Sequence, residues 1–139
     1  MKSGTGNRKS ARPPHRALPI GDYALISDCH CAALVSRRGS IDWCCMPRFD
    51  SEPCFGRLLD WERAGYCSIS PVEGSFDCAR RYLDDTMVLC TRFDTETGSA
   101  QVFDLLVLTD TNKARSDRQV LRIVEGLEGR VELEVDVAP

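Results

Sequence analysis

The sequence predicts an all-β protein, mainly an antiparallel β-sandwich. Short runs of alternating polar and apolar residues recur along the chain, and turn-forming residues separate them about every 8–12 residues, as is typical of sandwiches. Residues 130–137 alternate at every position and predict a half-buried strand. Only one stretch has helical spacing, which argues against βαβ units. The 139 residues suffice for one core, so we expect a single β-sandwich domain over residues 18–139.

Residues 1–17 are predicted to be a disordered basic tail. Residues 1–16 contain five Lys or Arg, no acidic residue and many Gly, Ser and Pro, so they can bury little apolar surface. The remaining chain contains 13 basic and 21 acidic side chains, a net charge of −8, which argues against nucleic acid as a partner. We find neither an apolar secretory core nor about 18 consecutive apolar residues. The sequence therefore predicts a cytoplasmic protein with no membrane partner.

A β-hairpin is expected near the start of the domain, after a short strand at residues 23–26. Residues 29–36 and 41–44 should form its arms, and Gly39 supplies the positive φ that the turn at Arg37–Gly39 requires. Pro47 cannot continue a central strand, so the chain should leave the sheet there on a loop.

A short helix is predicted over residues 53–61. Phe55, Leu58 and Leu59 have i, i+3, i+4 spacing there, and Ser51 is a suitable N-cap. Strands should follow at residues 66–70, 78–83, 86–94, 100–108, 119–124 and 130–137. We expect residues 100–108 to be apolar enough for burial on both faces, residues 109–117 to form a polar loop, and the last two strands to form a hairpin across residues 125–129.

The chain ends at Pro139, directly after its clearest strand. This suggests an interrupted sandwich, in which an unpaired strand edge and exposed apolar surface would favour self-association.

Eight cysteines admit several interpretations. A disulfide framework conflicts with a cytoplasmic location, and Cys29-His30-Cys31 and Cys44-Cys45 lack the spacing of a closed zinc site. Most are expected to be small buried hydrophobic residues. A zinc or redox cysteine module remains an alternative. The cysteines are Cys29, Cys31, Cys44, Cys45, Cys54, Cys67, Cys78 and Cys90.

No catalytic machinery is predicted within the chain. A glycosidase needs two convergent carboxylates, but spacing along strands does not show convergence, and Asp is also an ordinary turn residue. Two histidines without a G-x-S-x-G motif disfavour a nucleophilic triad. We therefore expect no catalytic residue, no metal and no cofactor. The carboxylates considered are Asp22, Asp28, Asp42, Asp50, Asp104 and Asp110.

Trp43, Arg48, Phe49 and Asp50 are the candidate substrate-binding residues. An aromatic ring beside a guanidinium and a carboxylate can hold a sugar by stacking and bidentate hydrogen bonds. The alternative is that Trp43 and Phe49 anchor the core while Arg48 and Asp50 brace the loop.

Several segments together resemble one protein family. They are residues 19–29 (PIGDYALISDC), 32–36 (AALVS), 39–43 (GSIDW), 47–51 (PRFDS), 80–83 (RRYL), 91–93 (TRF) and 121–127 (LRIVEGL). This set is similar to the trehalase-like N-terminal domain of bacterial glycoside hydrolase family 15, which includes glucoamylase- and trehalase-type enzymes.

The resemblance implies a β-supersandwich that precedes a catalytic (α/α)6 barrel in cis. The barrel of such an inverting enzyme carries two glutamates that hydrolyse α-glucosidic bonds, and their positions lie beyond Pro139. The chain is thus expected to be a non-catalytic domain, inactive alone, that packs on the barrel and lends the Arg48–Asp50 loop to its active-site rim. The alternative is a free-standing carbohydrate-binding or interaction module without enzymatic activity.

Overall fold

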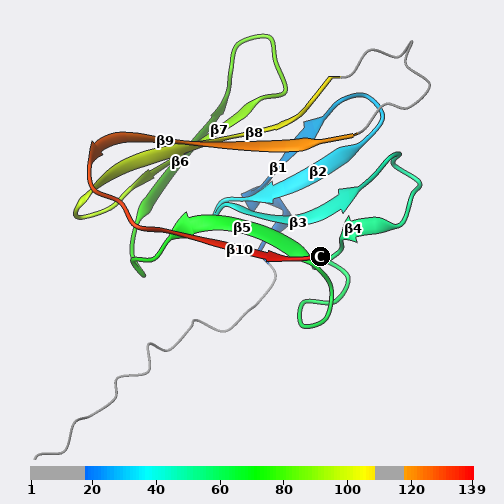
Figure 1. The fold of residues 1–139 in the computed structure, drawn as a ribbon, viewed down its shortest axis with the longest axis horizontal. Coiled ribbons are helices and arrows are strands. Elements are labelled where there is room, and N and C mark those ends of the chain that lie inside the picture. Colours follow the sequence, from blue (N-terminus) through cyan, green and yellow to red (C-terminus); the bar gives the residue numbers. More distant parts are fainter. Residues whose placement is uncertain (1–17, 109–117) are drawn as a thin grey trace, which may run out of the picture.

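The computed structural model describes residues 18–108 and 118–139, which form two antiparallel sheets stacked as a sandwich (Figure 1). Sheet A has the order β1–β2–β3–β5–β10, with β4 paired to β3, and sheet B has the order β6–β7–β8–β9. These sheets confirm the predicted fold class. The predicted tail, residues 1–17, and the predicted polar loop at 109–117 lie outside the described residues.

Sheet A contains β1 (Tyr23–Ser27), β2 (Ala32–Ser36), β3 (Ser40–Cys45), β4 (Pro53–Phe55), β5 (Tyr66–Pro71) and β10 (Leu133–Ala138). Sheet B contains β6 (Asp77–Tyr82), β7 (Leu89–Asp94), β8 (Gly98–Leu106) and β9 (Val120–Gly129). A single 3₁₀ turn, η1 (Ile20–Asp22), leads into β1. No helix in the described part of the chain is long and apolar enough to cross a bilayer.

The β2–β3 hairpin forms as the sequence predicts. Gly39 has φ +81°, and a Cβ at this position would collide with the Ile69 carbonyl oxygen of β5. Glycine is therefore required both by the turn and by the close approach of the neighbouring strand. β3 ends at Cys45, before Pro47, so the chain leaves the sheet where proline predicts.

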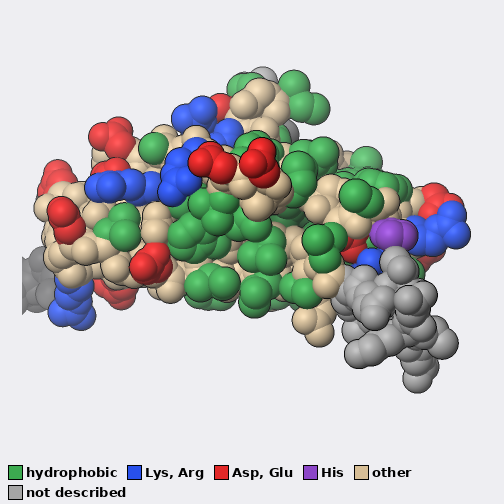
Figure 2. Space-filling view, turned by 90° about the horizontal axis from the view of Figure 1, so that it is seen from above, with side chains coloured by type: hydrophobic (Ala, Val, Ile, Leu, Met, Phe, Trp, Pro, Cys, Tyr) green, Lys and Arg blue, Asp and Glu red, His purple; other side chains and the backbone are tan. Residues whose placement is uncertain are grey.

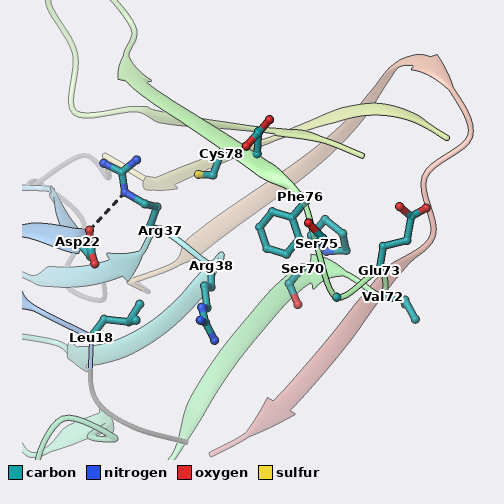
Figure 3. Close-up of a pocket in the computed structure, with 13 residues that line it drawn as sticks. Leu18, Asp22, Arg37, Arg38, Ser70, Val72, Glu73, Ser75, Phe76 and Cys78 are labelled. Atoms are coloured by element: carbon teal, nitrogen blue, oxygen red, sulfur yellow. Dashed lines mark ion pairs between the residues drawn. The ribbon is translucent and has the colours of Figure 1, made fainter. Parts of the chain in front are cut away.

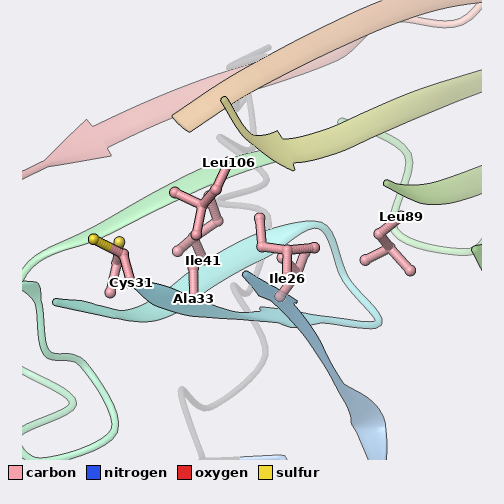
Figure 4. Packing of buried hydrophobic residues seen from close by; sticks show 8 residues of the cluster. Ile26, Cys31, Ala33, Ile41, Leu89 and Leu106 are labelled. Carbon is pink, nitrogen blue, oxygen red and sulfur yellow. The ribbon is translucent and has the colours of Figure 1, made fainter. Parts of the chain in front are cut away.

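The core lies between the two sheets. β1, β2 and β3 supply its lower wall, while Leu89 of β7 and Leu106 of β8 close it from sheet B (Figure 4). Residues 100–106 of β8 alternate between buried and half-buried side chains, so this strand is not fully buried on both faces as predicted. The main cluster is Ile26, Cys31, Ala33, Val35, Ile41, Cys44, Leu89 and Leu106.

The cysteines are free thiols that differ in burial. Four are buried (Cys31, Cys44, Cys45 and Cys90), two are half-buried (Cys67 and Cys78) and two are exposed (Cys29 and Cys54). Burial raises the pKa of the Cys31 and Cys90 thiols, which keeps them protonated and poorly nucleophilic. The buried cysteines therefore act as small core residues.

A buried ion pair within sheet B holds a guanidinium that also contacts sheet A. Arg122 Nε of β9 lies 2.6 Å from Asp104 Oδ1 of β8. The same guanidinium donates to the carbonyl oxygens of Cys67 in β5 and of Gly39 in the β2–β3 turn, each at 2.8 Å. Burial would lower the pKa of Arg122, but its hydrogen bond to Asp104 and the charge of that carboxylate outweigh burial and raise it. The guanidinium thus stays charged while it joins β9 to β5 and to the β2–β3 turn.

The predicted helix at residues 53–61 is wrong. Residues 53–55 form strand β4, in which Phe55 pairs with Cys44 of β3, and turns follow. Phe55 packs against the core, whereas Leu59 is exposed, so the three apolar residues share no buried helical face. Pairing with β3 gives the backbone of β4 its hydrogen bonds and places the Phe55 side chain against the core. These gains outweigh the weak helical periodicity of three residues.

The predicted last hairpin is also wrong. β9 runs through residues 125–129, where a turn was expected, and pairs with β8 in sheet B. β10 pairs instead with β5 in sheet A. The chain therefore changes sheets between β9 and β10.

Candidate functional site

The segment 46–51, here called the 46–51 loop, carries three of the four candidate residues out of the core. It begins where β3 ends and contains a cis Met46-Pro47 peptide bond. The Cys31 thiol donates to the Pro47 carbonyl oxygen at 2.9 Å, and the Phe49 N–H donates to the His30 carbonyl oxygen at 3.0 Å. These contacts fix the loop to the segment that precedes β2.

The side chains of the loop form a small exposed site. Arg48 Nε lies 3.0 Å from Asp50 Oδ1, and both side chains are 71% exposed. Phe49 is 58% exposed. Together with Cys29 and His30, these residues line a hollow of about 390 Å³. The arrangement offers an aromatic ring, a guanidinium and a carboxylate at one surface, which suits a polyhydroxylated ligand.

Trp43 does not line this hollow. It lies within β3, opposite Leu34 of β2, and its side chain is half-buried. The structure therefore brings Arg48, Phe49 and Asp50 together and leaves Trp43 in the sheet. The Arg48–Asp50 ion pair also matches the loop-bracing contact considered above, whereas Phe49 is too exposed to anchor the core.

Asp28 fixes the segment to which the 46–51 loop is attached. Its Oδ1 accepts hydrogen bonds from the His30 N–H at 2.9 Å and the Cys31 N–H at 2.6 Å, and its Oδ2 lies 3.0 Å from Arg118 Nη1. Burial alone would raise the pKa of Asp28, but the two N–H donors and the Arg118 charge outweigh it and lower the pKa. An ionised Asp28 thus holds the turn to which the 46–51 loop is attached.

A second buried carboxylate, Asp42, organises a network that the sequence did not reveal. It accepts hydrogen bonds from the Ser40 hydroxyl at 2.5 Å and the Tyr23 hydroxyl at 2.8 Å, and lies 3.9 Å from Arg57 Nη1. Burial, the hydrogen bond and the Asp42 charge all raise the pKa of Tyr23. The spacing of these residues gives no signal of their convergence. Only the i, i+2 relation of Ser40 and Asp42 on one strand face could have been noticed.

Arg57 is also held between two aromatic rings. Its guanidinium carbon lies 4.3 Å from the centre of the Trp61 ring and 3.8 Å from that of Tyr66, within cation–π range. The Tyr66 hydroxyl is bonded in turn to Asp136 Oδ2 of β10 at 2.5 Å. Arg57 and Trp61 lie in the turns that follow β4, so these contacts hold the turns against β5.

Each described candidate carboxylate forms an ion pair with a different arginine. This gives every one of them a structural partner within the domain. Asp110 lies outside the described residues. The pairs are Asp22–Arg37, Asp28–Arg118, Asp42–Arg57, Asp50–Arg48 and Asp104–Arg122. Among the residues described, no group of three or more His, Cys, Asp or Glu could hold a metal ion.

A larger groove, of about 800 Å³, lies at the β2–β3 turn. Arg37 and Arg38 border it on one side and Phe76 and Glu73 on the other (Figure 3). Arg37 is paired with Asp22 at 3.4 Å. The groove contains none of the four candidate residues, and its mixed charges select no ligand class, so the 46–51 loop is the better candidate.

Comparisons with known proteins converge on one group. The family model described as "Trehalase-like, N-terminal" matches residues 7–139. The chain is 38% identical over 136 residues to a trehalase of Mycolicibacterium smegmatis and 36% identical over 135 residues to a trehalase of Mycobacterium tuberculosis. Each alignment covers 87% of this chain and 20% of the relative.

A trehalase 1 of Sulfolobus acidocaldarius is 47% identical over 75 residues, which cover 54% of this chain and 13% of that protein. The chain thus spans about a fifth of the length of the mycobacterial relatives. No solved structure matches significantly.

Proposed function

The chain belongs to the family of trehalase-like N-terminal domains, and from this premise we propose that it is the non-catalytic β-sandwich of an α-glucoside hydrolase of the glucoamylase/trehalase type. The observation that carries the proposal is the coverage: 87% of the chain aligns with 20% of each mycobacterial trehalase. Most of each relative, and in our proposal its catalytic barrel, therefore lies outside the aligned part. The arginine partners of the described carboxylates agree with a structural role.

The first test is activity of the chain alone. Purified protein incubated with trehalose, maltose or starch should release no glucose above a blank that lacks protein. Glucose release that follows the protein through its last purification step would overturn the proposal.

The second test is replacement within a relative. A chimera in which residues 18–139 replace the aligned segment of the M. smegmatis trehalase should fold and retain the activity of its parent. A deletion variant without the segment should lose stability or activity and is the control. A chimera no better than the deletion would contradict the role as an N-terminal domain.

Within this role, we propose that the 46–51 loop borders the active site of the adjoining barrel and contacts the α-glucoside through Arg48, Phe49 and Asp50. Their exposure and shared hollow support this. In the chimera, Phe49→Ala should raise KM several-fold and leave kcat close to its original value, because a ring that binds ground state and transition state alike affects KM alone. Leu59→Ala, at another exposed position outside the hollow, is the matched control. Equal KM values for the two variants would show that the 46–51 loop does not contact the substrate.

A free-standing carbohydrate-binding module is the second candidate, favoured by the exposed ring of Phe49 beside the Arg48–Asp50 pair. In that case the chain alone would bind trehalose or maltose in a calorimetric titration, and Phe49→Ala would abolish the heat while the circular dichroism spectrum stayed unchanged. The free thiols support a cytoplasmic location for either candidate.

A further inference from the structure

Four of the eight cysteines gather at the base of the 46–51 loop. Cys31, Cys44 and Cys45 are buried, whereas Cys54 is exposed. The Cys54 thiol donates to the Cys44 carbonyl oxygen at 3.1 Å, and the thiols of these two residues are hydrogen-bonded to each other. Within the described ranges, no group of three or more such side chains has the arrangement of a metal site. The contact between the two thiols is therefore the feature to explain.

The pairing of β3 with β4 brings the backbones of Cys44 and Cys54 into disulfide range. Cys44 is paired with Phe55, the register shifts before Cys45, and the extra residue that β4 contains at this shift is Cys54. An extra residue of this kind bends the strand and re-aims its side chain. With a strand spacing of about 4.8 Å and a rise of about 3.4 Å per residue, the Cα atoms of Cys44 and Cys54 lie roughly 6 Å apart, within the range of about 4.4–6.8 Å that disulfides span.

We propose that Cys44 and Cys54 form a reversible disulfide when a hydroperoxide oxidises the exposed Cys54 thiol. Cys54 follows the 46–51 loop directly. Figure 2 shows basic, acidic and histidine side chains together at the end of the molecule that carries this loop, so this end faces water. A small polar oxidant can therefore approach Cys54 from the solvent.

The reaction has two balanced steps. The Cys54 thiolate attacks one peroxide oxygen, so that an S–O bond forms, the O–O bond breaks, and the departing oxygen takes up a proton as water or an alcohol; Cys54 becomes a sulfenic acid. The Cys44 sulfur then attacks the Cys54 sulfur, the S–S bond forms, and the S–O bond breaks with release of water that carries the Cys44 proton. Two thiols are oxidised and one peroxide is reduced. Exchange with a small thiol restores both cysteines.

The first step also prepares Cys44 for the second. Burial is the largest cause that raises the pKa of Cys44, and the charge of the neighbouring Cys54 thiolate is the next. Because a sulfenic acid is neutral, oxidation of Cys54 removes that charge and makes the Cys44 proton easier to lose. Successive residues of a strand face opposite ways, so the hydrogen bond between the Cys44 and Cys54 thiols selects Cys44 over Cys45.

The disulfide would close a covalent ring around the 46–51 loop, because Cys44 precedes the loop and Cys54 follows it. In the reduced protein, the loop is held by the Cys31 thiol on the Pro47 carbonyl oxygen and by the Phe49 N–H on the segment before β2. A crosslink at the base restricts the same segment in the unfolded chain as well. We therefore expect oxidation to stabilise the domain and to slow opening of the loop, whether or not the loop contacts a sugar.

The test is a peptide map of the full chain. Reduced protein is treated with one equivalent of hydrogen peroxide, its remaining thiols are blocked with iodoacetamide in denaturant, and it is digested with trypsin without reduction. Cleavage after Arg48 separates Cys44 and Cys54 into peptides 39–48 and 49–57. We expect these two peptides to be joined, with two hydrogens fewer than their sum, and to separate in dithiothreitol. Fragmentation of the joined pair should assign the link to Cys44.

Two variants with circular dichroism spectra like the wild type identify the partner. Cys45→Ala, the buried neighbour on the same peptide, is the matched control and should give the same joined pair. Cys44→Ala should give none, and its Cys54 should stop at the sulfenic acid, which dimedone traps on peptide 49–57. A joined pair that persists in Cys44→Ala, or that is lost in folded Cys45→Ala, overturns the proposal.

The wild type supplies readouts that depend on no substitution. The melting temperature should rise by about 5–10 °C on oxidation, and amide exchange in the 46–51 loop should slow. Oxidised wild-type protein without the joined peptides overturns the proposal, and an unchanged melting temperature with unchanged exchange contradicts the restriction of the loop. None of these results depends on glycosidase activity.

Discussion

Arg122→Ala tests the contact that joins the two sheets. Asp104 is completely buried, and its two oxygens lie 2.6 and 3.2 Å from Arg122 Nε and Nη2. The guanidinium also satisfies the carbonyl oxygens of Gly39 and Cys67. Truncation at Arg122 therefore leaves one buried carboxylate without its counter-charge and two carbonyl groups without this donor.

The expected loss of stability is large. Removing one partner of a buried ion pair costs about 3–5 kcal/mol, and each polar group left unsatisfied adds about 1–3 kcal/mol where water cannot reach it. A domain of this size has about 5–15 kcal/mol in total. We therefore expect a lower limit near 3 kcal/mol, which leaves the variant marginally folded.

The assay is urea unfolding followed by tryptophan fluorescence and by circular dichroism. Arg92→Ala is the matched control, because Arg92 forms a similarly short pair with Asp94, at 2.8 Å, on the exposed surface of sheet B. That variant should unfold at nearly the wild-type urea concentration. If Arg122→Ala unfolds at no lower urea concentration than Arg92→Ala, the buried contacts of Arg122 do not stabilise the fold more than an exposed ion pair does.

A double variant covers the case in which Arg122→Ala does not fold. Replacing a buried ion pair with apolar residues of similar volume is often neutral or stabilising, so Arg122→Met with Asp104→Leu should recover much of the lost stability. A double variant as unstable as Arg122→Ala would show that the carbonyl contacts, rather than the buried charge, dominate the loss.

Three further substitutions address local features. Gly39→Ala should lower the free energy of unfolding by about 1 kcal/mol or more, and with it the urea midpoint, because Gly39 has φ +81° and its Cβ would meet the Ile69 carbonyl; an unchanged midpoint would contradict this. Asp28 has a pKa lowered from 3.8, so its stabilisation is present at neutral pH and is lost as the pH falls below that value. Asp28→Asn should lessen the acid dependence of the melting temperature, and an identical acid profile would count against it. Tyr23 has a pKa raised above 10.0, so the folded state retains the phenolic proton and loses stability above that pH. Tyr23→Phe should lessen this alkaline loss, and an unchanged profile would contradict a raised pKa of Tyr23 in the folded state.

Local signals in the sequence predicted the parts of the fold that depend on local chemistry. The turn at Gly39 and the exit at Pro47 follow from the φ that glycine allows and the N–H that proline lacks. The strands followed from alternation, since a half-buried strand repeats every two residues. Periodicity failed as a guide at residues 53–61, where a helix was predicted. Phe55, Leu58 and Leu59 are too few to distinguish helical periodicity from a short strand followed by turns.

Long-range pairing could not be predicted from the same signals. Gly126 and Gly129 indicate a turn, but β9 continues through both because β8 offers a partner along its whole length. At the candidate site, the sequence places Arg48, Phe49 and Asp50 on one loop through their adjacency. It gave no means of separating them from Trp43, or of finding the convergence of Tyr23 and Arg57 on Asp42, because these contacts depend on how the sheet folds.

The pairing of β10 with β5 has a consequence for biosynthesis. The hydrogen bond between Tyr66 and Asp136 joins positions 70 residues apart, and β10 leaves the ribosome after all the other described strands. Sheet A therefore stays incomplete until synthesis has passed β10, although β1–β3 can pair early. Topologies with such distant partners fold slowly and expose strand edges while they wait. The nascent chain should then depend on chaperones over this interval more than a protein closed by local hairpins.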